Sequence, residues 1–215
     1  PGMTREAWAA ELSRALGFGT THLSLYQLTI EPGTRFAALF ARGELIMPDE
    51  DTSADLFAIT QSMTAAAGLP AYEISNHAAP GRESRHNLTY WRYGDYAGIG
   101  PGAHGRRAGV ATLRRKKPEL WLAGVRAAGH GLESETALTP DERATEALVM
   151  GLRLAEGIDA ARFAARTGVA LDAAVDMGAA RRLADQGLLD VSPAGIRLTP
   201  AGWPLANAVL AEIAR

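Results

Sequence analysis

Cysteine is absent from the 215 residues of this chain. Without thiols the chain forms no disulfide, no thiolate nucleophile and no cysteine-ligated zinc or iron–sulfur site. Lysine is scarce as well, since it occurs only at positions 116 and 117, and the formal net charge is −2. A chain with no excess of positive charge lacks the electrostatic field that attracts nucleic acid nonspecifically. We therefore expect no nucleic-acid partner.

Long hydrophobic runs are also missing. The longest stretch without a charged residue, residues 56–72, is interrupted by Thr, Gln, Ser, Gly and Pro, and the sequence does not open on a basic segment followed by an apolar one. We expect no membrane span and no signal peptide, and a cytoplasmic protein that is at most peripheral at a membrane. Apolar residues at 47% and charged residues at 21% are typical of a globular fold.

The first 75 residues alternate between helix and strand patterns. Thr4 is placed to cap a helix over residues 5–16, and residues 22–30 are typical of a strand. A second helix is expected over residues 51–67, and a strand follows at 71–75. Strand, helix and strand at this spacing predict a βαβ unit with parallel strands, so the fold class is α/β.

Residues 76–109 are rich in Gly, His, Asn, Tyr and Trp and show no helical period. We expect mostly loop with short strands there, of the kind that serves a site. Residues 106–117 carry six basic residues and no acidic one, which we interpret as a solvated loop or hinge between two units.

A second unit opens at Thr139-Pro140-Asp141-Glu142, which has the pattern of a capping box with proline at the first helical position. Asp159 is placed to cap another helix, and a third is expected over residues 171–186. Two strands then flank the turn at 192–195, and a closing helix starts at Thr199-Pro200. Three helices followed by a hairpin resemble a winged helix.

The densest group of chemically versatile side chains is Arg85-His86-Asn87-Leu88-Thr89-Tyr90-Trp91-Arg92. Imidazole ligates iron, aromatic rings cover a flat π system, and arginine binds carboxylates through paired hydrogen bonds. A porphyrin with its propionates needs all three. The alternative is that His86 and Asn87 bond to backbone while Tyr90 and Trp91 fill the core.

Glycine is concentrated in residues 98–105. Residues 100–105 satisfy G-x-G-x-x-G, but neither the following helix nor an acidic residue about 20 positions on is present, so we reject a Rossmann site. The glycines let backbone approach a ligand closely, and His104 lies among them. Either a cofactor edge or a tight turn explains this pattern.

Polar residues also occur near the ends of the two predicted strands. In α/β barrels the carboxyl ends of strands face the active site. The candidates are Ser24, Gln27, Thr29, Glu31, Glu73, Ser75 and Asn76. Two strand ends that converge with a histidine-containing loop predict a polar pocket.

Four of these motifs occur in an order that resembles a known family. They are His22-Leu-Ser-Leu-Tyr-Gln-Leu-Thr-Ile-Glu-Pro-Gly-Thr34, Tyr72-Glu-Ile-Ser-Asn76, His86-Asn-Leu-Thr-Tyr-Trp91 and Gly98-Ile-Gly-Pro-Gly-Ala-His-Gly105. Together they resemble the radical S-adenosylmethionine proteins related to oxygen-independent coproporphyrinogen III oxidase, in particular the HemW-type haem chaperone branch. The resemblance covers the whole chain.

The resemblance implies the last βα units of a partial (βα)6 barrel, followed by a small helical, winged-helix-like domain. We expect the barrel part at residues 1–110, a linker at 111–138 and the C-terminal domain at 139–215. The family's C-x-x-x-C-x-x-C loop belongs to an N-terminal part that these residues do not include. Without cysteine, this polypeptide alone is expected to hold no 4Fe-4S cluster and to be inactive in S-adenosylmethionine cleavage.

The resemblance also implies residue roles. Thr29 and His104 match positions that contact S-adenosylmethionine in the family, and Gln27 lies one step from that surface. Residues 86–91 match the H-N-x-x-Y-W motif associated with haem binding in the chaperone branch.

Within that motif we expect His86 to be the axial iron ligand, with Tyr90 and Trp91 as stacking walls and Asn87 as a further haem-binding residue. By charge alone, Arg85 or Arg92 is expected to hold a propionate.

Three functions follow from these patterns. The leading one is a haem-binding chaperone that delivers haem to an acceptor protein at the membrane. The runner-up is oxidative decarboxylation of coproporphyrinogen III to protoporphyrinogen IX. The third is DNA binding by the winged helix, which the charge of residues 139–215 disfavours, since they contain eight basic and ten acidic side chains.

Overall fold

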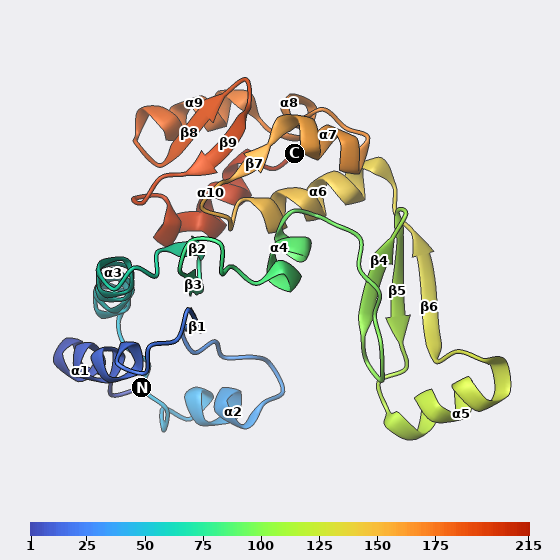
Figure 1. The fold of residues 1–215 in the computed structure, drawn as a ribbon, viewed down its shortest axis with the longest axis horizontal. Helices are drawn as coiled ribbons and strands as arrows, with labels where there is room; N and C mark the ends of the chain where they lie inside the picture. Colours follow the sequence, from blue (N-terminus) through green and yellow to red (C-terminus); the bar gives the residue numbers. More distant parts are fainter. The chain divides into compact units, whose positions relative to one another are not determined.

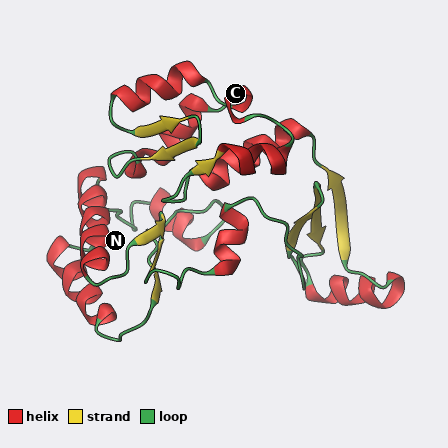
Figure 2. Ribbon diagram, turned by 45° about the horizontal axis from the view of Figure 1, so that its top comes forward, coloured by secondary structure: helices red, strands yellow, loops and turns green.

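The computed structural model describes all 215 residues, which cluster into two compact units, residues 1–84 and residues 85–215 (Figure 1). The strands form three small sheets of three strands each, separated in sequence by helices (Figure 2). No helix combines the length and the hydropathy that crossing a membrane requires.

The first unit contains three helices and one sheet. Its elements are α1 (Arg5–Leu16), β1 (His22–Ser24), α2 (Arg35–Ala41), α3 (Glu50–Ala66), β2 (Ala71–Glu73) and β3 (Asn76–Ala78). Each helix begins at a side-chain cap, because Thr4, Thr34 and Asp49 accept a hydrogen bond from a backbone N–H of the first turn. The predicted helices α1 and α3 are confirmed; α2 was not predicted.

The sheet of this unit has the order β1-β3-β2, and β3 is antiparallel to both neighbours. Thus β1 and β2 run parallel, as the βαβ pattern predicts, but a third strand lies between them. The predicted strand at 71–75 is wrong at its end, because Ile74 and Ser75 form a tight turn and the chain returns as β3.

The predicted strand at 22–30 is too long. Its last bond to the neighbouring strand runs from the Leu25 N–H to the Ser75 carbonyl, 2.8 Å. Ser24 already pairs with Asn76 at the start of β3, so residues 26–30 have no ladder to join and form no strand.

The second unit begins with a helix that the sequence did not predict. Its first elements are α4 (Arg85–Trp91), β4 (His104–Arg107), β5 (Val110–Arg114), α5 (Pro118–Ala128) and β6 (Leu132–Ala137). The expectation of loop over residues 85–91 is wrong, since these residues form α4. The sequence missed this helix because it shows no regular apolar stripe. Residues 111–138, expected as a linker, carry most of β5 together with α5 and β6, and the sheet has the order β4-β5-β6.

A winged-helix-like arrangement completes the chain. Its elements are α6 (Pro140–Gly151), β7 (Ile158–Asp159), α7 (Ala160–Thr167), α8 (Leu171–Ala174), α9 (Met177–Asp185), β8 (Leu189–Ser192), β9 (Gly195–Leu198), a 3-10 turn at Trp203–Leu205 and α10 (Ala206–Ile213). The capping box at Thr139 and Glu142 is confirmed, as is the cap of α7 by Asp159. Fully buried Leu148, Val175 and Ile213 belong to its core.

Two predicted helices of this region are corrected. The helix expected over residues 171–186 is broken at Val175, because the Asp176 carboxylate accepts the N–H groups of Gly178 and Ala179 and starts α9 anew. The closing helix begins at Ala206 and not at Thr199, whose hydroxyl accepts the Gly202 N–H and makes a turn instead.

Gly195 shows how tightly β7 and β9 approach. Its φ is +153°, and a Cβ atom built there would overlap the carbonyl oxygen of Ile158. Only glycine satisfies both conditions.

We therefore expect Gly195→Ala to lower the free energy of unfolding by about 3 kcal/mol through backbone strain and steric overlap. Gly187→Ala is the matched control: φ is +76° but no atom lies near the built Cβ, so only about 1 kcal/mol is expected. Urea denaturation of both variants measures the difference, and equal losses would contradict the steric argument.

Candidate functional site

The exposed end of α4 carries His86, which packs against Tyr90 with ring centroids 4.7 Å apart and planes at 66°. The two residues lie four apart and so share one face of the helix. No hydrogen bond or ion pair occupies the imidazole of His86. Tyr90 therefore contacts the edge of the His86 ring, while both nitrogen atoms of the imidazole stay available to a ligand.

Tyr90 in turn contacts Tyr96, with centroids 4.3 Å apart. Behind this pair lies Arg106, which is only 6% exposed and places its guanidinium 3.4 Å from the centre of the Tyr93 ring and 5.6 Å from that of Tyr96. Stacking of a guanidinium on aromatic faces is favourable, more so when it is desolvated. A row of contacts thus runs from His86 to the buried Arg106.

Glu146 of α6 neutralises this buried charge. Its Oε2 atom lies 3.2 Å from Arg106 Nη1 and accepts the Tyr93 hydroxyl at 2.7 Å, while Arg106 Nη2 donates to the Gly94 carbonyl at 3.1 Å. Tyr93 adopts φ +53°, an uncommon backbone conformation for a bulky residue, and these contacts offset its cost. The sequence analysis missed Arg106, Tyr93 and Glu146. The one local indication is the dipeptide Tyr93-Gly94 after α4, which is typical of a turn.

Burial raises the pKa of Tyr93, and the hydrogen bond to Glu146 raises it further. Burial also raises the pKa of Tyr96. Both phenols are therefore protonated at neutral pH.

Trp91 lies apart from His86. It follows His86 by five residues and so faces about 140° around the helix. Its ring meets the Arg153 guanidinium at 4.8 Å, and its buried Nε1 atom has no hydrogen-bond acceptor. Together with Ile158 and Phe163 it lines a cavity of only about 20 Å³. Trp91 therefore anchors α4 to the helical core, and of the predicted aromatic walls only Tyr90 lies beside His86.

The two arginines that flank the motif differ. Arg92 forms a paired hydrogen bond with the Glu156 carboxylate, at 2.8 and 2.6 Å, and Arg162 joins the same carboxylate at 2.9 Å. The hydrogen bond from Arg92, followed by the attraction of both guanidinium groups, holds the pKa of Glu156 below its usual value. Arg85 is exposed and its side chain has no partner, whereas Asn87 is half-buried.

The residues assigned to S-adenosylmethionine fall in different units. Gln27 and Thr29 belong to the first and His104 to the second. Gln27 donates through Nε2 to the Ser53 carbonyl at 3.1 Å, and Thr29 and His104 are both exposed.

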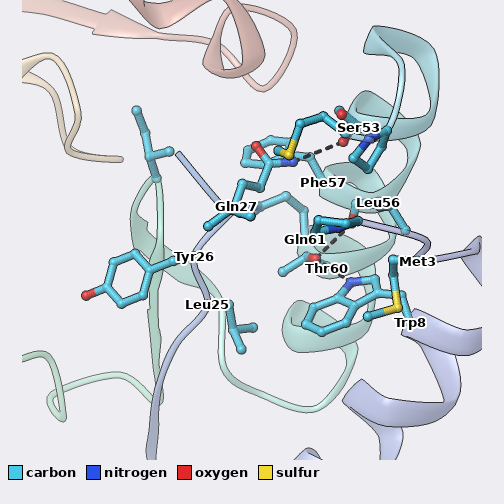
Figure 3. A pocket seen from close by; sticks show the side chains of 15 residues that line it. Met3, Trp8, Leu25, Tyr26, Gln27, Ser53, Leu56, Phe57, Thr60 and Gln61 are labelled. Carbon is cyan, nitrogen blue, oxygen red and sulfur yellow. Dashed lines mark hydrogen bonds between the residues drawn. The ribbon is translucent and has the colours of Figure 1, made fainter. Parts of the chain in front are cut away.

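Gln27 also lines a cavity of about 280 Å³ beside α3 (Figure 3). Trp8 reaches across it to donate to Thr60 Oγ1 at 2.9 Å, and Leu25 and Phe57 supply apolar walls. No charged side chain lines this cavity, so it offers no ion-pair partner for the amino-acid group of S-adenosylmethionine. The residues present do not make a complete site for that cofactor.

The polar residues at the β2–β3 turn do come together, but inside the first unit. Glu73 is fully buried and accepts from Asn76 Nδ2 at 2.6 Å and from the Ser75 N–H at 3.2 Å, while Ser24 donates to Asn76 Oδ1 at 2.7 Å. These contacts fix the turn. The predicted polar pocket at this end is instead a closed hydrogen-bond network.

His77 lies next to this network and is fully buried. Its Nδ1 atom lies 3.0 Å from Thr64 Oγ1, and its Nε2 atom has no partner. Burial lowers the pKa of His77 from 6.5 to about 4, an effect that nearby Glu73 partly opposes. The imidazole is neutral at pH 7.

Comparison with known proteins shows what this chain is similar to. Residues 138–205 match the profile described as the HemN C-terminal domain. The chain is 34% identical over 209 residues to the heme chaperone HemW of Bacillus subtilis, a match that covers 97% of this chain and 55% of that protein. It is 35% identical to the heme chaperone HemW of Escherichia coli, over 80% of this chain and 44% of that protein.

Two further matches agree. A mouse protein, the mitochondrial radical S-adenosyl methionine domain-containing protein 1, is 39% identical over 74% of this chain and 38% of its own length. The solved structure of coproporphyrinogen III oxidase HemN from Escherichia coli, a radical SAM enzyme, superposes with a TM-score of 0.73 over 98% of this chain and 52% of that one, at 19% identity. The chain spans about half the length of the HemW proteins from Bacillus and Escherichia.

The fold is therefore that of a radical S-adenosylmethionine protein: an α/β part followed by a helical C-terminal domain. Its sequence is similar to the HemW-type haem chaperones at 34–36% identity, and residues 138–205 match the C-terminal domain described for HemN.

One prediction concerns the buried charge. Arg106→Met removes the cation that neutralises Glu146, which keeps the Tyr93 hydroxyl as a donor, and leaves the Gly94 carbonyl without the Arg106 bond. We expect a loss of about 2 kcal/mol in unfolding free energy, since Glu146 is 40% exposed and partly hydrated. Arg107→Met, at the neighbouring exposed position, should stay within about 0.5 kcal/mol of the parent. Thermal unfolding compares them; an equal effect of both would contradict the role of Arg106.

A second prediction concerns pH. The pKa of His77 is lower in the folded chain than in the unfolded one, so the unfolded state binds more protons between pH 6.5 and about 4. The contribution of the neutral imidazole is complete above pH 6.5 and declines as the pH falls toward 4, by about 3 kcal/mol. His77→Phe should flatten this part of the profile of unfolding free energy against pH, and a slope unchanged in the variant would contradict the assignment.

Proposed function

We propose that this chain is the haem-binding part of a haem chaperone and that His86 is the axial ligand of the haem iron. The observation that carries the proposal is the exposed imidazole on α4, with both nitrogen atoms free of hydrogen bonds and one edge packed against Tyr90. Neutral imidazole is a common axial ligand of haem iron. The similarity to proteins named heme chaperone HemW supports haem as the cargo.

The surrounding residues define how the haem is received. We propose that Tyr90 limits rotation of the His86 ring and lies beside the porphyrin, because it is already fixed from behind by Tyr96. Asn87 and Trp91 belong to the same motif, and we assign them the task of holding α4 in place. A ligand on a rigid helix stays oriented toward the iron, which favours defined binding and release.

The radical S-adenosylmethionine relatives suggest that a longer polypeptide binds S-adenosylmethionine and a 4Fe-4S cluster. Gln27, Thr29 and His104 stay our proposed contacts to S-adenosylmethionine in such a polypeptide. The present chain has no cysteine, so its residues do not fit the cluster. We likewise propose that the chain divides into residues 1–110, 111–138 and 139–215. We also propose a cytoplasmic location and a haem acceptor protein at the membrane.

Haem delivery is preferred to porphyrinogen decarboxylation. HemN, which is named as an oxidase, shares the fold at 19% identity, a level that supports no transfer of activity. The relatives named heme chaperone share 34–36% identity with this chain.

Haem titration of the chain tests the proposal. We expect saturable binding with a shift of the Soret band, and a dissociation constant raised about tenfold or more in His86→Ala, since loss of an axial ligand removes at least about 1.4 kcal/mol. His130→Ala, at an exposed histidine of the same unit, is the control and should bind like the parent. No saturable binding, or equal effects of both variants, would count against a haem site at His86.

A further inference from the structure

A groove of about 420 Å³ lies beside α4, on the side where Arg85 and Arg92 emerge. Four guanidinium groups line it: Arg85 and Arg92 from α4 and its end, and Arg162 and Arg166 from α7. All four belong to the same unit of the chain. So many arginines around one hollow define an anion-binding surface.

Two of these arginines are already engaged. Glu156 binds Arg92 through both carboxylate oxygens and also accepts from Arg162. These contacts fix the two guanidinium groups in place. Arg92, which charge alone suggested as a propionate partner, is therefore committed to a carboxylate of the protein itself.

The other two are free. Arg85 and Arg166 are exposed, line the groove and form no hydrogen bond or ion pair. The carboxylate in the lining is Asp95, whose Oδ2 atom already accepts the Ala108 N–H at 3.2 Å. Four guanidinium groups against Asp95 and Glu156 leave an excess of two positive charges.

We propose that Arg85 and Arg166 bind the two propionate carboxylates of haem, an inference that rests on the function proposed above. Two carboxylates carry the charge that the groove lacks, and the guanidinium fork matches a carboxylate through paired hydrogen bonds. Arg85 directly precedes His86 on α4 and lies about 100° from it around the helix, so the groove flanks the face that carries the iron ligand. Arg166, which no sequence motif singled out, is the second carboxylate partner in place of Arg92.

The test compares haem with iron protoporphyrin dimethyl ester, which has the same ring and iron but no propionate charge, in identical detergent micelles. The parent chain should bind haem more tightly than the ester. Arg85→Gln and Arg166→Gln should each weaken haem binding about fivefold, as expected for ion pairs at exposed positions, and the double variant about 25-fold, while ester binding stays constant. Arg126→Gln, at an exposed arginine of α5, is the charge-matched control.

The outcomes separate this inference from the proposed function. If His86→Ala weakens haem binding but the double arginine variant retains the parent's preference for haem over the ester, the propionate site is wrong and the haem proposal stands. If nothing binds haem, both are wrong. If haem and ester bind equally while inorganic phosphate binds the parent and not the double variant, the groove takes phosphate and the propionate assignment is overturned. Circular dichroism verifies that each variant is folded.

Discussion

Burial of the Arg106 guanidinium is the constraint on which the arrangement around α4 depends. A buried charge is costly unless it is neutralised and hydrogen-bonded. Arg106 meets this requirement with the Glu146 carboxylate, the Gly94 carbonyl and the faces of Tyr93 and Tyr96. These partners come from the turn after α4, from the segment before β4 and from α6, so one side chain ties three parts of the unit together.

This constraint explains why the proposed ligand sits on a rigid surface. Tyr96 is held by Arg106, Tyr90 packs on Tyr96, and His86 packs on Tyr90. The opposite side of α4 is held separately, by Trp91 within the helical core and by Arg92 on Glu156. The helix is therefore secured on two sides while the His86 imidazole and the Arg85 guanidinium remain open to solvent, an arrangement that suits the reception of a flat, doubly anionic cargo.

Local signals in the sequence were reliable where the interaction itself is local. The capping residues Thr4, Thr139 and Asp159 mark helix starts correctly because each side chain accepts a hydrogen bond from a backbone N–H three residues on. Strand lengths were not predictable, because a strand ends where its partner ends: β1 stops at Ser24 where β3 begins to turn. The break at Val175 combines the local cap by the Asp176 carboxylate with a hydrogen bond from the Asp176 N–H to the carbonyl of Ile213, 37 positions away in sequence.

The same distinction applies to the site. The sequence by itself determined the similarity to HemN and the HemW-type chaperones, the absence of cysteine and the motif that contains His86, because these depend only on residue identity and order. The tertiary structure decided which motif residues act together: helical geometry pairs His86 with Tyr90 and turns Trp91 away, and Glu156, 64 positions from Arg92, engages that arginine and leaves Arg85 and Arg166 free. Such pairings are set by contacts between distant segments, and no local pattern encodes them.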